Sequence, residues 1–186
     1  MIAVVFDTET TGLISNHSIK INQQAEIIEF YGEEVDLADN GKMLRELDLL
    51  IKPSRPLSDT PAFGEKKTTT QITGITNAML ADCPPFGRVA NDIEGLLSTA
   101  KFVIAHNVSF DQEMIDLEFE RLHRMMAWPR AICTVESTIH LKGGRLNLTK
   151  LHEHLFGMAF ADAHRAKHDV QALIRCCVEL FKRGIL

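Results

Sequence analysis

The stretch MIAVVFDTETTG, residues 1–12, joins a short apolar run to a pair of acids. The run from Ile2 to Phe6 predicts a buried strand, and Asp7 and Glu9 follow it two positions apart. Residues i and i+2 of a strand point to the same side, so two carboxylates would lie side by side at the end of a core element. They repel each other, and burying an unpaired charge is costly. The pattern therefore indicates a functional use for both acids.

Length and composition describe an ordinary globular protein. The 186 residues are 45% hydrophobic and 24% charged, which predicts one domain spanning residues 1–186. No apolar run is long enough to cross a membrane, and the N-terminus lacks the basic start of a signal peptide. The four cysteines have no zinc-binding spacing. They are predicted to be reduced thiols of a cytoplasmic protein.

The charge is unevenly distributed along the chain. A net charge of −5 argues against a protein that coats nucleic acid non-specifically. Residues 1–50 hold ten acidic and three basic residues, whereas residues 142–168 hold five basic and two acidic ones. Taken alone, the basic stretch is a solvated surface. It gains meaning only if it lies next to an active site.

Hydrophobic periodicity predicts a mixed α/β domain. Strands are expected over residues 2–7, 25–37, 43–52, 101–105 and 131–135. Helices are expected over residues 77–82, 88–99, 134–141, 147–155 and 165–183, and a polar loop over 12–24. The segment 43–52 also fits a helix. Ser109 and Gln112 fit a capping box, which predicts that a further helix begins at Phe110. Early strands followed by strands mixed with helices indicate a mixed sheet flanked by helices.

Two more acids occupy informative places. Asp111 falls in the first turn of the helix that follows the 101–105 strand. Asp169 lies near the start of the last helix, five residues after His164. Binding sites in α/β sheets collect where strands end and helices begin. Both acids are therefore candidates to join the first pair.

The order of these residues resembles the DEDDh branch of the DnaQ-like 3′–5′ exonucleases, near the exonuclease domain of the proofreading epsilon subunits. Three motifs carry the resemblance: FDTETTG at 6–12, AHNVSFD at 105–111 and HRAKHD at 164–169. The segments LNLTKLHEHLFG at 146–157 and GITNAML at 74–80 also resemble connecting segments of that group. The resemblance covers nearly the whole chain. It implies a ribonuclease-H-like fold, with a mixed sheet of about five strands flanked by helices.

The resemblance implies two divalent cations, Mg²⁺ or Mn²⁺, held about 4 Å apart by four carboxylates. The implied metal ligands are Asp7, Glu9, Asp111 and Asp169. Crowded carboxylates repel one another when empty and become favourable once cations arrive. Asp7 is expected to contact both ions, and Glu9 and Asp169 the ion beside the attacking water. Asp111 is expected to act directly or through water.

The family's general base is expected to be His164, with Glu9 as the second catalytic residue. Imidazole titrates near neutrality and can take a proton from the attacking water. His168 is the competing histidine, but the spacing of four residues between histidine and aspartate favours His164. We expect His164 on the loop before the last helix, from which it would swing over the metals. Its mobility is a hypothesis.

The substrate side is predicted from the same resemblance. The candidates are Thr8, Thr10, Thr11, Gly12, Leu13, Ile75, His106, Asn107 and Phe110. Gly12 would let the backbone approach a sugar closely. Ile75, with the two residues before it, is expected to wedge against the penultimate base. Phe110 either packs under the terminal base or belongs to the core, and Phe63 either stacks on a base or anchors its loop. His106 either lines the groove or is a satisfied histidine at a strand end.

The function indicated is a metal-dependent 3′–5′ exonuclease that releases nucleoside 5′-monophosphates from single-stranded or frayed 3′ ends. DNA is the leading substrate and RNA the alternative. A non-catalytic nucleic-acid-binding or polymerase-binding module stays open, as does a ribonuclease-H-like endonuclease or Asp-x-Glu transferase. The chain stops after its last helix at FKRGIL. It is therefore expected to be free-standing in a bacterial or phage-infected cell or to dock on a DNA polymerase through the domain itself. A homodimer stays open.

Overall fold

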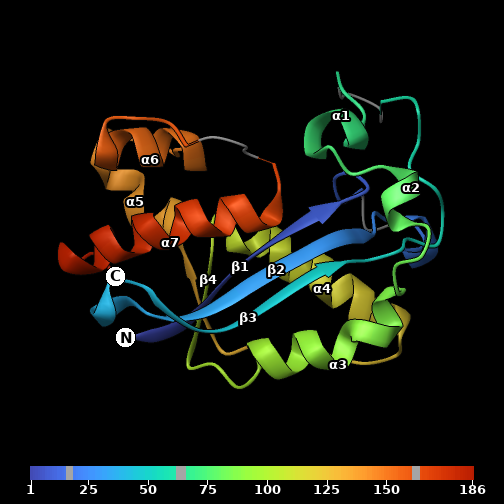
Figure 1. Ribbon diagram of the computed structural model, residues 1–186, viewed down its shortest axis with the longest axis horizontal. Helices are drawn as coiled ribbons and strands as arrows, with labels where there is room; N and C mark the ends of the chain where they lie inside the picture. Colours follow the sequence, from blue (N-terminus) through green and yellow to red (C-terminus); the bar gives the residue numbers. More distant parts are fainter. Residues whose placement is uncertain (16–18, 62–65, 161–163) are drawn as a thin grey trace.

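The computed structural model describes residues 1–15, 19–61, 66–160 and 164–186, and its centre is a five-stranded mixed sheet (Figure 1). The strands are β1 (Ile2–Thr10), β2 (Ile27–Asp36), β3 (Lys42–Leu50), β4 (Phe102–Ala105) and β5 (Arg130–Cys133). Their order is β3-β2-β1-β4-β5. The first three strands pair antiparallel, and β4 and β5 continue the sheet in parallel. The predicted mixed sheet is confirmed, and the helical alternative for residues 43–52 is wrong.

Helices cover both faces of this sheet. They are α1 (Thr69–Thr73), α2 (Asn77–Leu80), α3 (Phe86–Leu97), α4 (Val108–Arg121), α5 (Thr134–Lys142), α6 (Leu148–Phe156) and α7 (Ala166–Lys182). Two short 3-10 turns, Ile21–Gln23 and Leu37–Asp39, flank β2. Figure 1 shows α3 and α4 on one side of the sheet and α7 on the other, with α5 and α6 beyond α7. None of the described helices combines the length and apolar character that crossing a membrane requires.

The apolar run of β1 is continuous because both faces of this central strand are buried. Val4 and Phe6 belong to the hydrophobic cluster under α3 and α4. Ala3 and Val5 belong to the cluster under α7. All four side chains are fully buried. By the alternation of the strand, Asp7 follows on the α7 face of the sheet.

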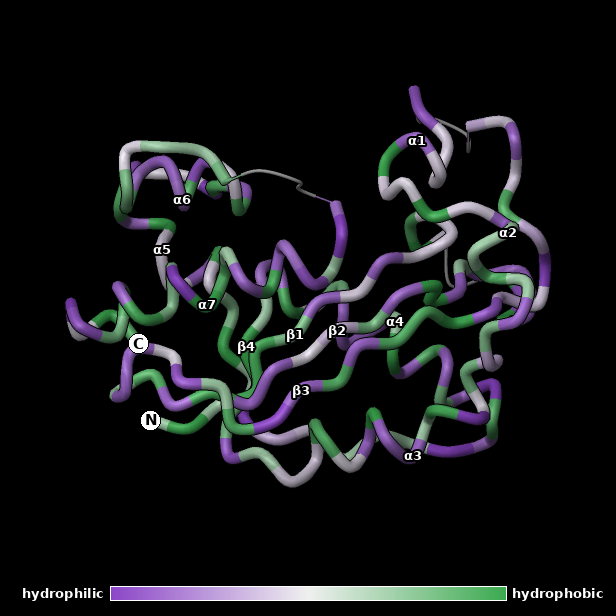
Figure 2. Tube along the Cα trace, viewed as in Figure 1, coloured by the Kyte–Doolittle hydropathy of each residue, from purple (hydrophilic) through white to green (hydrophobic). Residues whose placement is uncertain are grey.

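The outer strand β3 is far more exposed than β1. Figure 2 shows the contrast: β4 and the adjoining part of β1 are hydrophobic, whereas much of β3 is hydrophilic. Charged side chains on an edge strand discourage pairing with a second sheet. β3 therefore closes the sheet on one side, and the functional end of β1 lies near its centre.

Two boundaries differ from their predictions. β1 extends to Thr10 rather than ending at residue 7, because its pairing with β2 continues past the acids to Ile27, with an irregularity after Glu9. α4 begins at Val108 rather than Phe110. Its N-cap is Asn107, in the left-handed region with φ of 73°, and the cap makes no side-chain hydrogen bond. The predicted capping box is therefore wrong at this helix.

A short helix that the periodicity does not predict, α1, has such a box instead. Its N-cap Thr68 accepts a hydrogen bond from the backbone of Gln71, whose side chain in turn accepts from the Thr68 backbone. The reciprocal pair satisfies two of the amide groups that a helix start leaves free. Five residues are too few for an apolar period to be visible in the sequence.

Candidate active site

Three of the predicted carboxylates meet where β1 and α7 lie against each other. Asp7 and Glu9 point from β1 toward the α7 layer, and Asp169 lies in the first turn of α7. One carboxylate oxygen of each lies within 4.8 Å of the others. All three side chains are partly exposed. Residues 160 positions apart in the sequence thus converge on one small volume.

The fourth acid, Asp111, enters from the opposite layer. It lies in the first turn of α4 and is only 3% exposed. Its Oδ1 accepts hydrogen bonds from Thr8 N at 3.1 Å and Thr8 Oγ1 at 2.7 Å. Thr8 therefore turns its hydroxyl inward onto Asp111. Asp111 is bonded to β1 next to Asp7, and its negative charge raises the pKa of Asp7.

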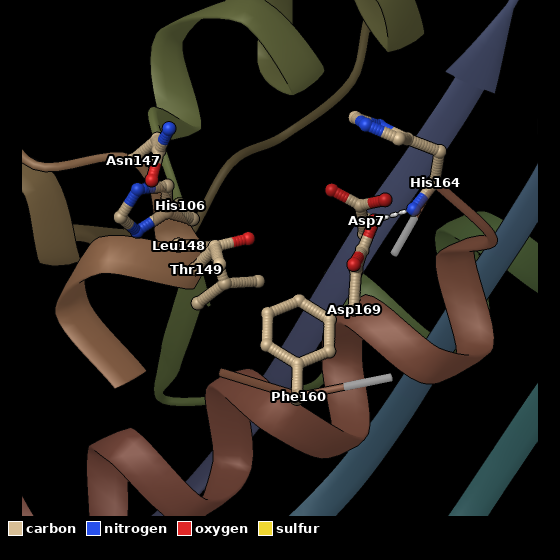
Figure 3. Close-up of a pocket in the computed structure, with 8 residues that line it drawn as sticks. All are labelled: Asp7, His106, Asn147, Leu148, Thr149, Phe160, His164 and Asp169. Atoms are coloured by element: carbon tan, nitrogen blue, oxygen red, sulfur yellow. Dashed lines mark hydrogen bonds between the residues drawn. The ribbon is translucent and has the colours of Figure 1, made fainter. Parts of the chain in front are cut away.

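His164 lies just outside α7, on the preceding loop as predicted. Its backbone is left-handed, with φ of 73°, and its N–H donates to Asp169 Oδ2 at 3.0 Å. Figure 3 shows its imidazole on the same side of the pocket as the carboxylates of Asp7 and Asp169. His168 is exposed in the first turn of α7 and does not line this pocket.

Asp7, Asp169 and His164 open into a pocket of about 230 Å³. Its lining residues are Asp7, His106, Asn147, Leu148, Thr149, Phe160, His164 and Asp169. In Figure 3, Asn147 and Thr149 form the wall facing the acids, and the ring of Phe160 stands between the two sides. Sequence reasoning did not single out Asn147, Leu148, Thr149 or Phe160. The first three lie in the 146–157 segment, whose resemblance to a connecting segment was the available signal.

His106 lines the pocket, but both of its ring nitrogens form hydrogen bonds with other residues of the protein. Nδ1 lies 2.9 Å from Thr134 Oγ1, and Nε2 lies 3.0 Å from the carbonyl oxygen of Leu146. Since a carbonyl only accepts, Nε2 carries the proton and Nδ1 accepts from the hydroxyl. Burial lowers the pKa of His106, which favours this neutral form. His106 therefore fixes the wall of the pocket.

The residues after Glu9 form a hydrogen-bonded turn at the rim of the sheet. Thr10 Oγ1 donates to the carbonyl oxygen of Gly12 at 2.7 Å. Thr11 pairs with the backbone of Glu26, and its carbonyl accepts from Thr69 Oγ1 of α1 at 3.0 Å. No atom lies within 4 Å of the position a Gly12 Cβ would take, and Leu13 is 68% exposed. This rim has room for a ligand.

Other predicted substrate residues lie elsewhere. Ile75 was expected to wedge against a base, but it is fully buried and packs with Ile28, Leu57 and Leu80 beneath α2. An apolar side chain that follows the C-cap of α1 gains more from burial in the interior than from exposure beside a strand of nucleic acid. That expectation is therefore corrected.

Phe110 and Asn107 have internal contacts. Phe110 is half-buried and packs against the cluster under α3 and α4, in agreement with its reading as a core residue. Asn107 caps α4, and its Oδ1 accepts from Arg145 Nη2 at 3.1 Å. Arg145 thereby brings part of the basic stretch to the edge of the site. Phe63, the other aromatic candidate, lies outside the described residues.

Burial raises the pKa of all four acids, and at Asp7 and Glu9 the charges of the neighbouring carboxylates add to the effect. Burial raises the pKa of Glu9 to about 8, and the charge of Asp169 adds to the effect. Burial also raises the pKa of Asp111 to about 7, against the hydrogen bonds from Thr8. Burial, and then the charges of Asp111 and Glu9, hold the pKa of Asp7 well above its usual range. The pKa of Asp169 is raised by burial. The site is thus electrostatically unfavourable when its carboxylates stand alone.

This donor set fits hard divalent cations. It offers carboxylate oxygens only, and Mg²⁺ and Mn²⁺ prefer oxygen ligands. The spacing lets Asp7, Glu9 and Asp169 reach one small volume together. Positive charge there would favour the ionised carboxylates that burial disfavours. Asp7, Glu9 and Asp169 are therefore the residues that would hold a cation, and Asp111, bonded to Thr8, adds a further carboxylate beside Asp7.

The raised pKa values predict an inverted dependence of stability on pH in EDTA. Glu9 and Asp111 stay protonated when folded at pH values where the unfolded chain has released those protons. The folded state then binds more protons, so the free energy of unfolding falls as pH rises from about 4.5 to about 8. We expect a loss on the order of 2 kcal/mol after solvent screening, roughly 5 °C in melting temperature. Thermal unfolding followed by circular dichroism measures it.

Glu9→Gln is the matched control. Because an amide does not titrate, the melting temperature of this variant in EDTA should fall less steeply with pH than that of the wild-type protein. Adding Mg²⁺ at the upper end of the range should restore much of the lost melting temperature in the wild-type protein. A wild-type melting temperature in EDTA that stays level or rises over this range would contradict the electrostatic description of the site.

The mixed sheet and its acid cluster define the class: a ribonuclease-H-like nuclease of the kind that uses divalent metal ions. Residues 4–177 match the model of the RNase_T exonuclease family. The chain belongs to this family, and the expected DnaQ-like, DEDDh type of 3′–5′ exonuclease is confirmed.

The chain is similar in sequence to the PolC-type DNA polymerase III of Staphylococcus aureus. It is 33% identical over 189 residues, which cover 98% of this chain and 12% of the polymerase. The chain therefore spans about an eighth of the curated relatives it matches, and their activities as whole proteins do not transfer with the similarity.

Solved structures show the same fold. One is exonuclease X in complex with 5′ overhanging duplex DNA, with a TM-score of 0.68 and 23% identity; the match covers 98% of this chain and 93% of that one. Another is the nuclease domain of 3′hExo, a DEDDh family member, bound to rAMP. Its TM-score is 0.76 at 17% identity, with 98% and 92% of the two chains covered.

Proposed function

We propose that this exonuclease removes nucleotides from single-stranded or frayed 3′ ends of DNA and releases nucleoside 5′-monophosphates. The observation that carries the proposal is the meeting of Asp7, Glu9 and Asp169 within 4.8 Å, beside a pocket that Asp7, Asp169 and His164 line. Oxygen ligands for cations and an imidazole thus face one cavity. Phosphodiester hydrolysis needs both.

Each residue of the site has a separate role in the proposed hydrolysis of the phosphodiester. Two divalent cations, when bound, neutralise charge on the attacking and leaving oxygens of the phosphodiester. Asp7, Glu9 and Asp169 hold them, with Asp111 acting directly or through water. His164 takes a proton from the attacking water as its oxygen bonds to phosphorus and the bond to the leaving 3′ oxygen breaks. That oxygen gains a proton from solvent, and the released nucleotide keeps the 5′-phosphate.

The pocket favours a short stretch of strand. A cavity of about 230 Å³ suits one terminal nucleotide, with Phe160 and Leu148 offering apolar surface to its base or sugar. The net charge of −5 gives little non-specific attraction to a long polyanion. Phosphate contacts would therefore be local. Arg145, bonded to Asn107, and Lys150, next to the pocket residue Thr149, are the candidates of the basic stretch for such contacts.

DNA leads RNA because the PolC-type relative is named as a DNA polymerase, and exonuclease X was solved with DNA. RNA is the second candidate, because the 3′hExo nuclease domain was solved with rAMP. The PolC relationship also supports a DNA polymerase as a working partner. We further propose that residues 1–186 act as one domain. Their cysteines within the described residues are free thiols, as expected in a bacterial cytoplasm.

The test is digestion of 3′-labelled DNA and RNA oligonucleotides of equal sequence in Mg²⁺, Mn²⁺ or EDTA. We expect mononucleotides from the labelled end, faster release from DNA, and complete loss of activity in EDTA, because the three acids cannot bind the phosphodiester without cations. Thin-layer chromatography against 5′- and 3′-monophosphate standards identifies the product.

Other outcomes would point elsewhere. Digestion that survives EDTA would rule out the metal mechanism. Cutting of a covalently closed single-stranded circle would indicate an endonuclease. Binding of the oligonucleotides without cleavage in either metal would indicate a non-catalytic module.

A further inference from the structure

The loop that carries His164 is joined to the sheet by an ion pair between Arg165 and Glu29. Arg165 directly follows His164 and immediately precedes α7. Glu29 lies in β2, opposite Glu9 in the β1–β2 register, and is 1% exposed. The pair therefore connects the residue next to the predicted base with the strand beside the acids.

The contact is a two-pronged one. Arg165 Nη2 donates to Glu29 Oε1 at 2.6 Å, and Nε donates to Oε1 at 3.0 Å and to Oε2 at 3.2 Å. Glu29 Oε2 also accepts the backbone N–H of Ala166 at 2.9 Å. Such a fork fixes direction as well as distance. Glu29 thus restrains both a side chain and a backbone group of the segment after His164.

Glu29 also completes the start of α7. The N-cap residue Arg165 makes no side-chain capping hydrogen bond, and Ala166 is the first helical residue. Its N–H is one of those that a helix start leaves unsatisfied. The carboxylate of Glu29 satisfies it from a neighbouring strand and places negative charge at the positive end of the helix. The first turn, which carries Asp169, is thereby fixed to β2.

His164 is held from the other side by Asp169, whose Oδ2 accepts the His164 N–H. A left-handed backbone is uncommon for a non-glycine residue and persists where the surroundings impose it. We propose that the Glu29–Arg165 pair is a positioning clamp, which holds this backbone so that the His164 imidazole faces the carboxylate site. The inference rests on the proposed function.

The electrostatics of the site indicate that the Glu29–Arg165 pair serves to fix orientation rather than to add stability. The Glu29 charge adds to the crowding of acids by raising the pKa of Glu9, which Arg165 opposes. Glu29 is buried whereas the Arg165 side chain is 37% exposed, and an ion pair of this kind adds little net stability but fixes orientation. Lys167, two residues further on, offers a contrast. It makes single contacts with Asp48 at 3.1 Å and Glu46 at 3.7 Å, on the surface.

Arg165→Ala tests the clamp on single-stranded DNA with a 3′ label. We expect kcat to fall about tenfold, because a displaced base reduces the fraction of productive geometries. KM for the oligonucleotide should stay within twofold, because Arg165 is not among the residues lining the pocket. Lys167→Ala is the matched control and should keep wild-type kcat. Melting temperatures of all variants identify losses due to unfolding.

The decisive readout is coupling to His164. In a His164→Ala background, Arg165→Ala should change kcat less than twofold, because no imidazole remains to be positioned. An equal loss in both backgrounds would show that Arg165 supports the fold or the metal ligands, and would overturn the proposal. So would an Arg165→Ala enzyme as fast as wild type.

A second variant covers the case in which Arg165→Ala does not fold. Glu29→Gln keeps an amide oxygen for the Ala166 N–H but loses the charged fork. It should lower kcat about fivefold, again only when His164 is present. The proposed exonuclease function and the proposed clamp would be contradicted by different results. A wild-type enzyme inactive on every oligonucleotide ends the proposed function, whereas an active one with silent clamp variants ends only the clamp.

Discussion

Asp7→Asn should abolish exonuclease activity while making the metal-free protein more stable. Its carboxylate meets Glu9 and Asp169 within 4.8 Å and carries the repulsion of Asp111 as well. An amide cannot supply the anionic oxygen that two cations would share, so we expect kcat to fall at least ~10³-fold in Mg²⁺. Removing the charge also relieves the repulsion, so the melting temperature in EDTA should rise by a few degrees.

Steady-state release of labelled mononucleotide and thermal unfolding in EDTA measure the two effects on one preparation. Asp92→Asn makes the same chemical change at an exposed position of α3, in the layer across the sheet from α7. It should alter neither quantity. An Asp7→Asn enzyme within threefold of the wild-type rate would mean that the cluster is not the reaction centre.

His164→Ala should lower kcat by about 10² to 10³, with KM changed by no more than a few-fold. The loss of a positioned general base costs this much in proton transfer without weakening strand binding. The backbone bond from His164 to Asp169 remains in the variant, because it uses the main-chain N–H. The acids therefore keep their places, and the binding of Mg²⁺, followed by calorimetry, should stay close to wild type.

His168→Ala distinguishes the two histidines of the motif. His168 lies four residues after His164, exposed on α7 and outside the pocket. Removing its imidazole should therefore leave the rate of nucleotide release within twofold of wild type. If instead His168→Ala is the slow enzyme and His164→Ala the fast one, the base has been assigned to the wrong residue.

The acid cluster is the part of the structure that local sequence predicted best. Asp7 and Glu9 follow an apolar run whose alternation decides which way they point, and strand geometry needs no knowledge of the partners. The position of Asp169 followed from a helix start. That Asp111 would bond to Thr8 from the opposite layer could not be read from either segment, because it depends on how α4 crosses β1.

What the sequence did not reveal depends on long-range packing. Ile75 has the same neighbours in the chain whether it meets a base or the interior, and the packing of α2 decides. Phe160 lines the pocket together with residues of α6 and α7, and Glu29 reaches Arg165 across 136 residues. In the sequence, a glutamate such as Glu29 interrupts the apolar pattern of a buried strand. Its burial is understood only once its partner Arg165 is known.

The carboxylates of the pocket are contributed by β1 and α7, at nearly opposite ends of the described chain. During synthesis on a ribosome, a nascent chain therefore has its first acids long before Asp169 exists. By the proposed mechanism, cleavage requires that α7 has been translated and has docked on β1. A product truncated before that helix would keep Asp7 and Glu9 but lack Asp169, and so would have only part of the proposed cation site.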